Sequence, residues 1–267
     1  MEFCNLISKI NEEKNQLKST TRYENIKADY FLEKVFNNLK KGKTLNIVKY
    51  NKNIKRRINI NTNDYKEYSE KYSSIEIEIK PVSNKYGEFI KIKEEEEIYY
   101  HIYFNNNEEE IKRNYIKEDE EIKIIRIKID YQVKSFENLF YFRECIESIS
   151  FKKFYRNNIN NMIGMFYGCS SLKELNLNNF NTNNVTEMDG MFCGCSSLKE
   201  LNINNFNTND KANISYMFFK CSSLKELKLN NFNTNNGTDM RYMFEGCSYD
   251  LNRKIKSENK NIKDEAF

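Results

Sequence analysis

The chain has 267 residues, of which 39% are hydrophobic and 31% charged, with one proline and no tryptophan. Isoleucine, leucine, valine and phenylalanine make up about a quarter of it, which is enough to form a packed core. The 43 basic and 39 acidic residues are too balanced to favour binding to nucleic acid. No apolar run approaches the length of a membrane span, so we expect no membrane insertion. The start, Met1–Asn5, lacks the features of a secretion signal, and we expect a cytoplasmic protein.

A helical region is expected first, over residues 1–73. Apolar residues such as Phe31, Leu32, Val35, Phe36 and Leu39 have helical spacing, and a basic run follows at 52–57. Residues 30–58 are similar to an F-box, although the leading Leu-Pro of that motif is absent. This resemblance implies a ubiquitin-ligase adaptor as an alternative function.

A strand-rich region is expected over 74–121, where isoleucines and aromatic residues alternate with charged ones. The alternation covers Ile75–Ile79, the pair Ile90 and Ile92, and the segment 98–104. The acidic runs Glu94–Glu97 and Glu108–Glu110 are interpreted as loops. We expect this region to cover the first apolar face of the repeats that follow.

A 26-residue repeat dominates the second half of the chain. The cysteines, methionines and phenylalanines that recur at this interval are Cys169, Cys195, Cys221 and Cys247, Met165, Met191, Met217 and Met243, and Phe166, Phe192, Phe218 and Phe244. The Leu-x-x-Leu-x-Leu pattern of residues 172–177 extends upstream to Ile146, and to Ile122 at a 24-residue offset. We therefore predict about five units over 122–248.

Each unit shows two periodicities. Leu175-Asn-Leu177 alternates as in a strand, whereas Met188, Met191, Phe192 and Cys195 have the spacing of one helix face. The helix is expected to end at Gly168, Gly194 and Gly246, and to end differently at Lys220. A single unit buries too little apolar surface to fold alone. The fold expected is α+β: a helical and β region, then a β/α leucine-rich-repeat solenoid with terminal caps, the last cap at 249–267.

The string Met-Phe-x-Gly-Cys-Ser-Ser-Leu-Lys-Glu-Leu-Asn-Leu-Asn-Asn-Phe-Asn-Thr-Asn resembles the leucine-rich repeats of BspA-like proteins, the 26-residue-repeat surface proteins. The resemblance covers about 122–248. It implies a leucine-rich-repeat fold and, as a further alternative, a cell-surface adhesin.

The candidate catalytic and metal-binding groups favour structural interpretations. A straight column of cysteines cannot converge on one zinc ion, so we predict that these thiols pack in the core. The methionines repeat beside phenylalanines, which also indicates core packing. His101 is the single histidine and has no nucleophile near it in sequence. We therefore expect no enzyme activity, no cofactor and no metal.

The outward positions of the repeat strands remain as the candidate site. We predict a monomer that binds an unidentified protein partner through this face. The predicted contact residues are Glu174, Asn176, Asn178, Glu200, Asn202, Asn204, Glu226, Lys228 and Asn230, with a neighbouring column of Lys173, Lys199 and Lys225.

Overall fold

A computed structural model describes residues 66, 70–208, 212–229 and 238–267. The chain divides into two compact units, Met1–Tyr68 and Ser69–Phe267, and nearly all described residues belong to the second. The F-box-like segment 30–58 therefore lies outside the described residues. No described helix combines the length and the apolar character needed to cross a membrane.

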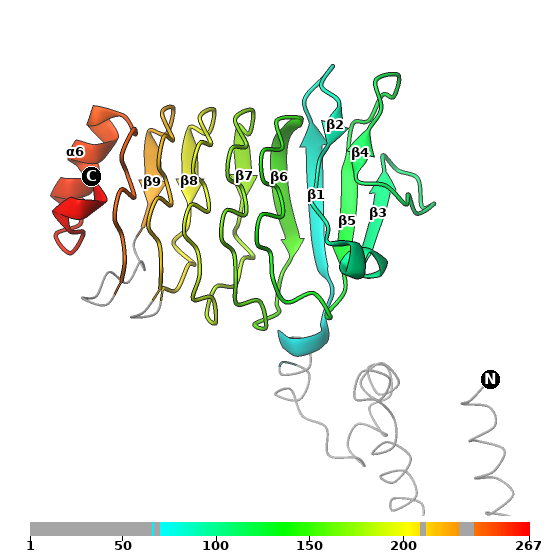
Figure 1. Cartoon of the computed structure of the whole chain (residues 1–267), viewed down its shortest axis with the longest axis horizontal. Helices are drawn as coiled ribbons and strands as arrows, with labels where there is room; N and C mark the ends of the chain where they lie inside the picture. Colours follow the sequence, from blue (N-terminus) through cyan, green and yellow to red (C-terminus); the bar gives the residue numbers. More distant parts are fainter. Residues whose placement is uncertain (1–65, 67–69, 209–211, 230–237) are drawn as a thin grey trace, which may run out of the picture. The chain divides into compact units, whose positions relative to one another are not determined.

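A five-stranded sheet in the order β3-β5-β1-β6-β7 forms the first part of this unit (Figure 1). Ile75, Ile77 and Ile79 of β1 are buried, whereas Glu76 and Glu78 between them are not, which confirms the predicted alternation. The strand bounds are Ile75–Pro81 for β1, Tyr100–Phe104 for β3, Ile125–Ile129 for β5, Ile146–Lys153 for β6 and Glu174–Asn176 for β7. Strand β1 is antiparallel to both β5 and β6.

The connection between β1 and β3 differs from the sequence prediction. Phe89 and Ile90 are buried, but neither Ile90 nor Ile92 lies in a strand. The acidic run Glu94–Glu97, expected as a loop, begins the 3₁₀ helix η1 (Glu94–Tyr99). A two-residue strand β2 (Gly87–Glu88) pairs instead with β4 (Tyr115–Ile116).

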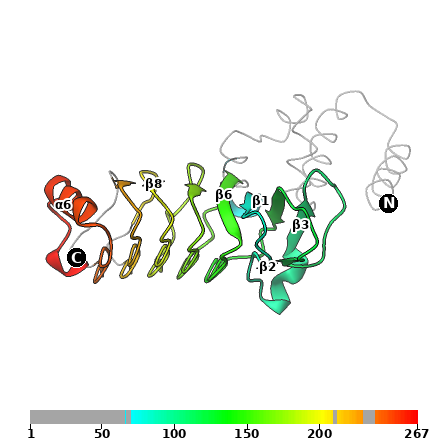
Figure 2. The same ribbon diagram turned by 90° about the horizontal axis from the view of Figure 1, so that it is seen from above.

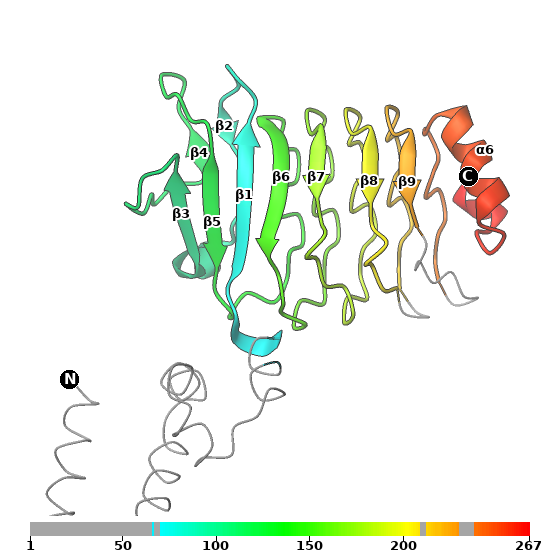
Figure 3. The ribbon, with the colours of Figure 1, turned by 180° about the vertical axis from the view of Figure 1, so that it is seen from behind.

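The 26-residue units lie side by side after β6, as Figure 3 shows for their strands. Strand β6 is parallel to β7, with Ser148 opposite Glu174, and β8 (Glu200–Asn202) is parallel to β9 (Glu226–Lys228). Isolated parallel bridges join Ser135, Asn161, Glu187, Asn213 and Asp239 in succession. We call the described residues of 134–247 the repeat stack.

The predicted fold class is wrong: this region is not a β/α leucine-rich-repeat solenoid. No described residue between 105 and 248 is helical, and the sheets are small and mixed. The segment from Met188 to Cys195, predicted as a helix, is a succession of turns. The described part of the chain is therefore built mainly of short strands and turns, with few helices.

Backbone hydrogen bonding explains why the turns replace the helix. The N–H groups of Gly164, Phe166 and Gly168 donate to carbonyls of the next unit at 2.7–2.9 Å. The N–H groups of Met165 and Tyr167 donate three residues back within their own unit. An α-helix would instead direct every one of these donors four residues back. The backbone N–H groups of this segment thus donate alternately to carbonyls of their own unit and to carbonyls of the next unit.

Two left-handed positions per unit make these turns possible. Gly164 and Gly190 have φ of 55° and 59°, and Gly168 and Gly194 have φ of 70° and 72°. At Lys220 we expected the unit to end differently, but this residue adopts the same left-handed conformation as these glycines, with φ of 57°. Its N–H donates to the carbonyl of Glu245 at 2.8 Å, as the glycines do in their units.

Aromatic rings and thiols repeat through the interior of the stack. Phe166, Phe192 and Phe218 are fully buried, and their rings stack with centroids 5.5 and 5.4 Å apart. The thiol of Cys195 is also buried and donates to the carbonyl of Phe166 at 3.2 Å. Burial confirms that the repeated phenylalanines and methionines and three of the four repeated cysteines pack in the core, whereas Cys247 is partly buried.

The first repeat strand was misplaced in the sequence analysis. Residues 122–129 were assigned to a unit directly before β6, but β1 lies between β5 and β6 in the sheet. The turn part of this unit does join the stack, since Phe140 stacks on Phe166 at 5.5 Å. The fully buried Arg156 joins the two regions by donating to the carbonyls of Asp130 and Val133 at 2.8 and 3.0 Å. Burial lowers the pKa of this guanidinium to about 10.

The carboxyl-terminal segment lies against the last repeat unit. Helix α6 (Tyr249–Glu258) begins at Ser248, whose hydroxyl accepts from the N–H of Leu251. Leu251 and Ile255 are buried, and η2 (Asp264–Ala266) follows. The N–H of Phe244 donates to the carbonyl of Ala266, so the segment continues the inter-unit bonding of the stack.

Candidate functional site

The predicted contact residues lie on the strand side of the repeat stack. Figure 2 shows the strands and the turns on opposite sides of each unit. The exposed members are Glu174, Asn176, Asn178, Glu200, Asn202, Glu226 and Lys228, whereas Asn204 is half-buried. Asn230 lies outside the described residues. We call the exposed side chains of this set, with Lys173, Lys199 and Lys225, the strand face.

Two of the asparagines have a structural task. The side-chain oxygen of Asn176 accepts from the backbone N–H of Asn178 at 3.0 Å, and that of Asn202 accepts from Asn204 at 3.1 Å. Such bonds end a strand in a local turn. These turn bonds alone explain why an asparagine recurs at this position, without any contact to a partner.

The charges at the amino-terminal border of the strand face are paired. Glu147 precedes Lys173 by one unit and contacts both Lys173 and Lys80, at 2.9 and 2.8 Å. Hydrogen bonds from these two lysines lower the pKa of the Glu147 carboxyl. Glu174 lies near Lys80, whose pKa is raised chiefly by its bond to Glu147. The charges of Glu147, Lys173 and Lys80 are therefore already compensated within the chain.

The opposite border is paired as well. Glu226 contacts Lys254 of α6 at 2.9 Å, and this bond lowers the pKa of the Glu226 carboxyl. Between the two borders, the side chains of Lys199, Glu200 and Lys225 form no ion pair with another described residue. These three charges therefore remain available to a partner.

A second set of polar residues, not predicted from the sequence, connects the units. The amide of Asn205 donates to the carbonyls of Leu177 and Phe180 in the preceding unit, both at 2.8 Å. The buried hydroxyl of Thr182 donates to the carbonyl of Asn207 and accepts from its N–H, at 3.1 and 2.7 Å. The repeated Asn-Phe-Asn-Thr string was the available signal for these bonds.

Aromatic side chains cluster on the turn side of the repeat stack. This cluster was not predicted from the sequence. The rings of Tyr141 and Tyr167 stack with centroids 5.1 Å apart, and those of Tyr216 and Tyr242 lie 5.1 Å apart. Phe142, half exposed, lies directly over Gly168, where a Cβ atom would meet its ring at 2.6 Å. Glycine at this position therefore makes room for an aromatic ring of the preceding unit.

The groups considered for catalysis are held in structural contacts. His101 lies between two carboxylates, with Nδ1 3.0 Å from Glu110 and Nε2 3.3 Å from Asp130. Burial raises the pKa of the Cys169 thiol to about 12, so the thiolate is disfavoured at neutral pH. Among the described residues no three His, Cys, Asp or Glu side chains form a group that could hold a metal ion.

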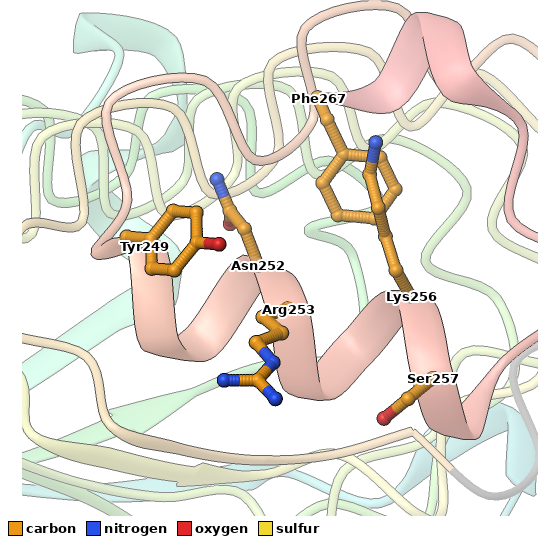
Figure 4. Close-up of a pocket in the computed structure, with 6 residues that line it drawn as sticks. All are labelled: Tyr249, Asn252, Arg253, Lys256, Ser257 and Phe267. Atoms are coloured by element: carbon orange, nitrogen blue, oxygen red, sulfur yellow. The ribbon is translucent and has the colours of Figure 1, made fainter.

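A basic hollow of about 510 Å³ lies beside α6 (Figure 4). Its lining residues are Tyr249, Asn252, Arg253, Lys256, Ser257 and Phe267. The ammonium group of Lys256 lies over the Phe267 ring at 4.3 Å and 3.4 Å from a carboxylate oxygen of Asp264. The guanidinium of Arg253 forms no ion pair with another described residue. The hollow thus combines aromatic surface with positive charge.

Comparison with known proteins gives one family for part of the chain. The family described as "Mycoplasma protein of unknown function, DUF285" matches residues 134–259. The match covers the repeat stack and all of α6, and it begins after β5. No curated protein and no solved structure matches the chain. The resemblance to BspA-like repeats stays a prediction.

Proposed function

We propose that the protein is a non-enzymatic binding module that recognises a protein partner through the strand face. The observation that carries the proposal is the pair of opposite charge rows at the centre of this face. Lys199 and Lys225 stand in one row, Glu200 stands in the adjacent row, and none of the three has an ion partner among the described residues. The turns and inter-unit bonds beneath them hold the rows in fixed positions.

Rigidity supports this proposal because it lowers the entropic cost of binding. Leu201 and Leu227, which directly follow these charged residues in the strands, are buried and fix the direction in which Lys199 and Glu200 project. Successive strands lie about 4.8 Å apart, so the charges recur at a regular spacing. A partner with charges at matching intervals can form several contacts without ordering a flexible loop.

The proposal replaces part of the predicted contact set. Asn176 and Asn202 are assigned to strand termination, and Glu226 to its contact with α6. Lys199, Glu200 and Lys225 are the main contact residues that we propose, with Glu174 and Lys228 beside them. Because exposed ion pairs contribute only about 0.2–1 kcal/mol each, the partner must contact several of these groups at once.

Affinity purification of the full chain, followed by mass spectrometry, would identify the partner. Its capture is then compared between the wild type and a Lys199→Glu/Lys225→Glu variant. We expect capture to fall at least tenfold, because two attractions become repulsions. The control reverses two charges on the turn side, Lys220→Glu and Glu245→Lys, and should leave capture unchanged. Equal capture by the wild type and the strand-face variant would refute the proposal.

A further inference from the structure

Two side chains are more exposed than the other large hydrophobic residues of the described chain. Tyr249 is 78% exposed and Ile98 is 69% exposed. Ile98 belongs to η1, which leads into β3 at one edge of the five-stranded sheet. Tyr249 begins α6, which follows the last repeat unit. The elements that carry them, η1 with β3 and helix α6, therefore lie beyond opposite ends of the repeat stack (Figure 1).

Their surroundings carry opposite charge. Ile98 directly follows the four carboxylates Glu94–Glu97, and none of these carboxylates forms an ion pair with another described residue. Tyr249 lies at the hollow beside α6, together with Arg253 and Lys256 (Figure 4). No Asp or Glu side chain lines this hollow. The contact of Lys256 with Asp264 is long, and Asp264 is fully exposed, so it compensates little of the positive charge.

We propose that the α6 hollow binds η1 of a second copy of this chain. Ile98 of one copy packs against the Tyr249 and Phe267 rings of the other. Glu95 and Glu97, both exposed, face Arg253 and Lys256. The occupant is a second copy because one chain supplies both the exposed apolar anchor with its acidic surroundings and the basic, aromatic receptor. The proposed assembly replaces the monomer that we expected from the sequence.

The size of the hollow suits this occupant. Its volume of about 510 Å³ lies within the range of about 300–1,000 Å³ that holds small ligands, and so admits an isoleucine with part of the acidic turn. The contact joins two different surfaces. It can therefore produce an antiparallel pair in which both contacts form, or a chain of copies. Neither the residues that line the hollow nor those of η1 belong to the strand face.

The test measures the mass of the full chain by analytical ultracentrifugation over a range of protein concentrations. We expect the average mass to rise with concentration at low salt, and the association to weaken at high salt, where charges are screened within about 3 Å. A mass that stays monomeric at every concentration overturns the proposal. An acidic peptide that binds the hollow of a monomeric chain would also overturn it, because the occupant would then be another protein.

Charge-reversal variants locate the contact. Arg253→Glu/Lys256→Glu and Glu95→Lys/Glu97→Lys should each weaken association at least tenfold, and an equimolar mixture of the two should associate again. Failure of the mixture to associate contradicts the assigned pairing. The exposed-residue variants Ile98→Ser and Tyr249→Ser give the same information without changing charge. Lys199→Glu/Lys225→Glu should leave association intact, so this result is independent of the proposed function.

Discussion

Substituting alanine for Gly168 and, separately, for Gly194 tests the turn architecture of the repeat stack. Both glycines occupy the same position in successive units and have nearly the same φ, 70° and 72°. They differ in what an added methyl group would meet. At Gly168 it would lie 2.6 Å from the Phe142 ring, whereas at Gly194 the nearest atom is the Cα of Gly168 at 3.5 Å. The pair therefore separates backbone strain from side-chain overlap.

The expected magnitudes follow from these contacts. The left-handed conformation costs an alanine about 1–2 kcal/mol, and this cost is common to both variants. Displacing the Phe142 ring adds about 1–3 kcal/mol for Gly168→Ala alone. Since the compact unit Ser69–Phe267 has roughly 200 residues, each kcal/mol of lost stability lowers the melting midpoint by about 2–4 °C. Gly168→Ala should therefore melt several degrees below Gly194→Ala.

Chemical and thermal unfolding of the full chain, followed by circular dichroism, measures the difference. Adding Phe142→Ala to Gly168→Ala should reduce the cost of the glycine substitution to that seen at Gly194. Equal costs for the two single variants, or a cost at Gly168 that persists without the Phe142 ring, would refute the packing described for the turn side.

Three further predictions follow from the same structure. Lys220→Gly should raise the free energy of unfolding by about 0.5–1 kcal/mol in denaturant titrations, because glycine tolerates the left-handed φ of 57° at this position; a loss of stability would contradict this. Thr182→Val should cost about 1–3 kcal/mol in the same assay, because the N–H and carbonyl of Asn207 each lose a partner; an unchanged midpoint would show that water replaces the hydroxyl. The pKa of Cys169 is raised by folding from 9.0 to about 12, so its stabilising contribution is present below pH 9 and is lost as the pH rises through this interval. Between pH 9 and 10.5 the unfolding free energy of the wild type should therefore fall more steeply than that of the Cys169→Ala variant, by about 1.4 kcal/mol per pH unit. Identical slopes for the two proteins would exclude a buried neutral thiol at this position.

The buried residues of the repeat could be predicted because burial follows from repetition alone. Phe166, Met191 and Cys195 recur at one interval, and only a stack of units removes all of them from water. The β1 alternation was equally informative, since each isoleucine of Ile75–Ile79 faces the core. These predictions required only the spacing of apolar residues.

The helix prediction failed because the spacing i, i+3, i+4, i+7 is not unique to helices. Successive turns with left-handed residues four apart present the same side chains to the core. The glycine pair Gly164 and Gly168 was the signal that a helix is disfavoured, because two glycines in eight residues weaken a helix by about 2 kcal/mol. Inter-unit hydrogen bonding, which decides the outcome, is not visible in a single unit.

The position of β5 could not be inferred from the repeat register. Ile125 and Ile127 match the leucine spacing of later units, but β1 pairs with both β5 and β6 and separates them. Such pairing depends on a strand nearly fifty residues away in sequence. The candidate site was affected in a similar way: the exposure of Glu200 and Lys228 followed from strand alternation, whereas the turn bond of Asn202 and the pairing of Glu226 with Lys254 required the three-dimensional structure.

The dissociation constant of a charge-swapped strand face tests the proposed function most directly. A Lys199→Glu/Glu200→Lys variant exchanges the two rows at one unit, keeps the net charge and changes only exposed side chains. Titration calorimetry with the captured partner should give a dissociation constant at least tenfold higher than that of the wild type, with an unchanged melting midpoint. An unchanged dissociation constant would show that the partner does not recognise these rows.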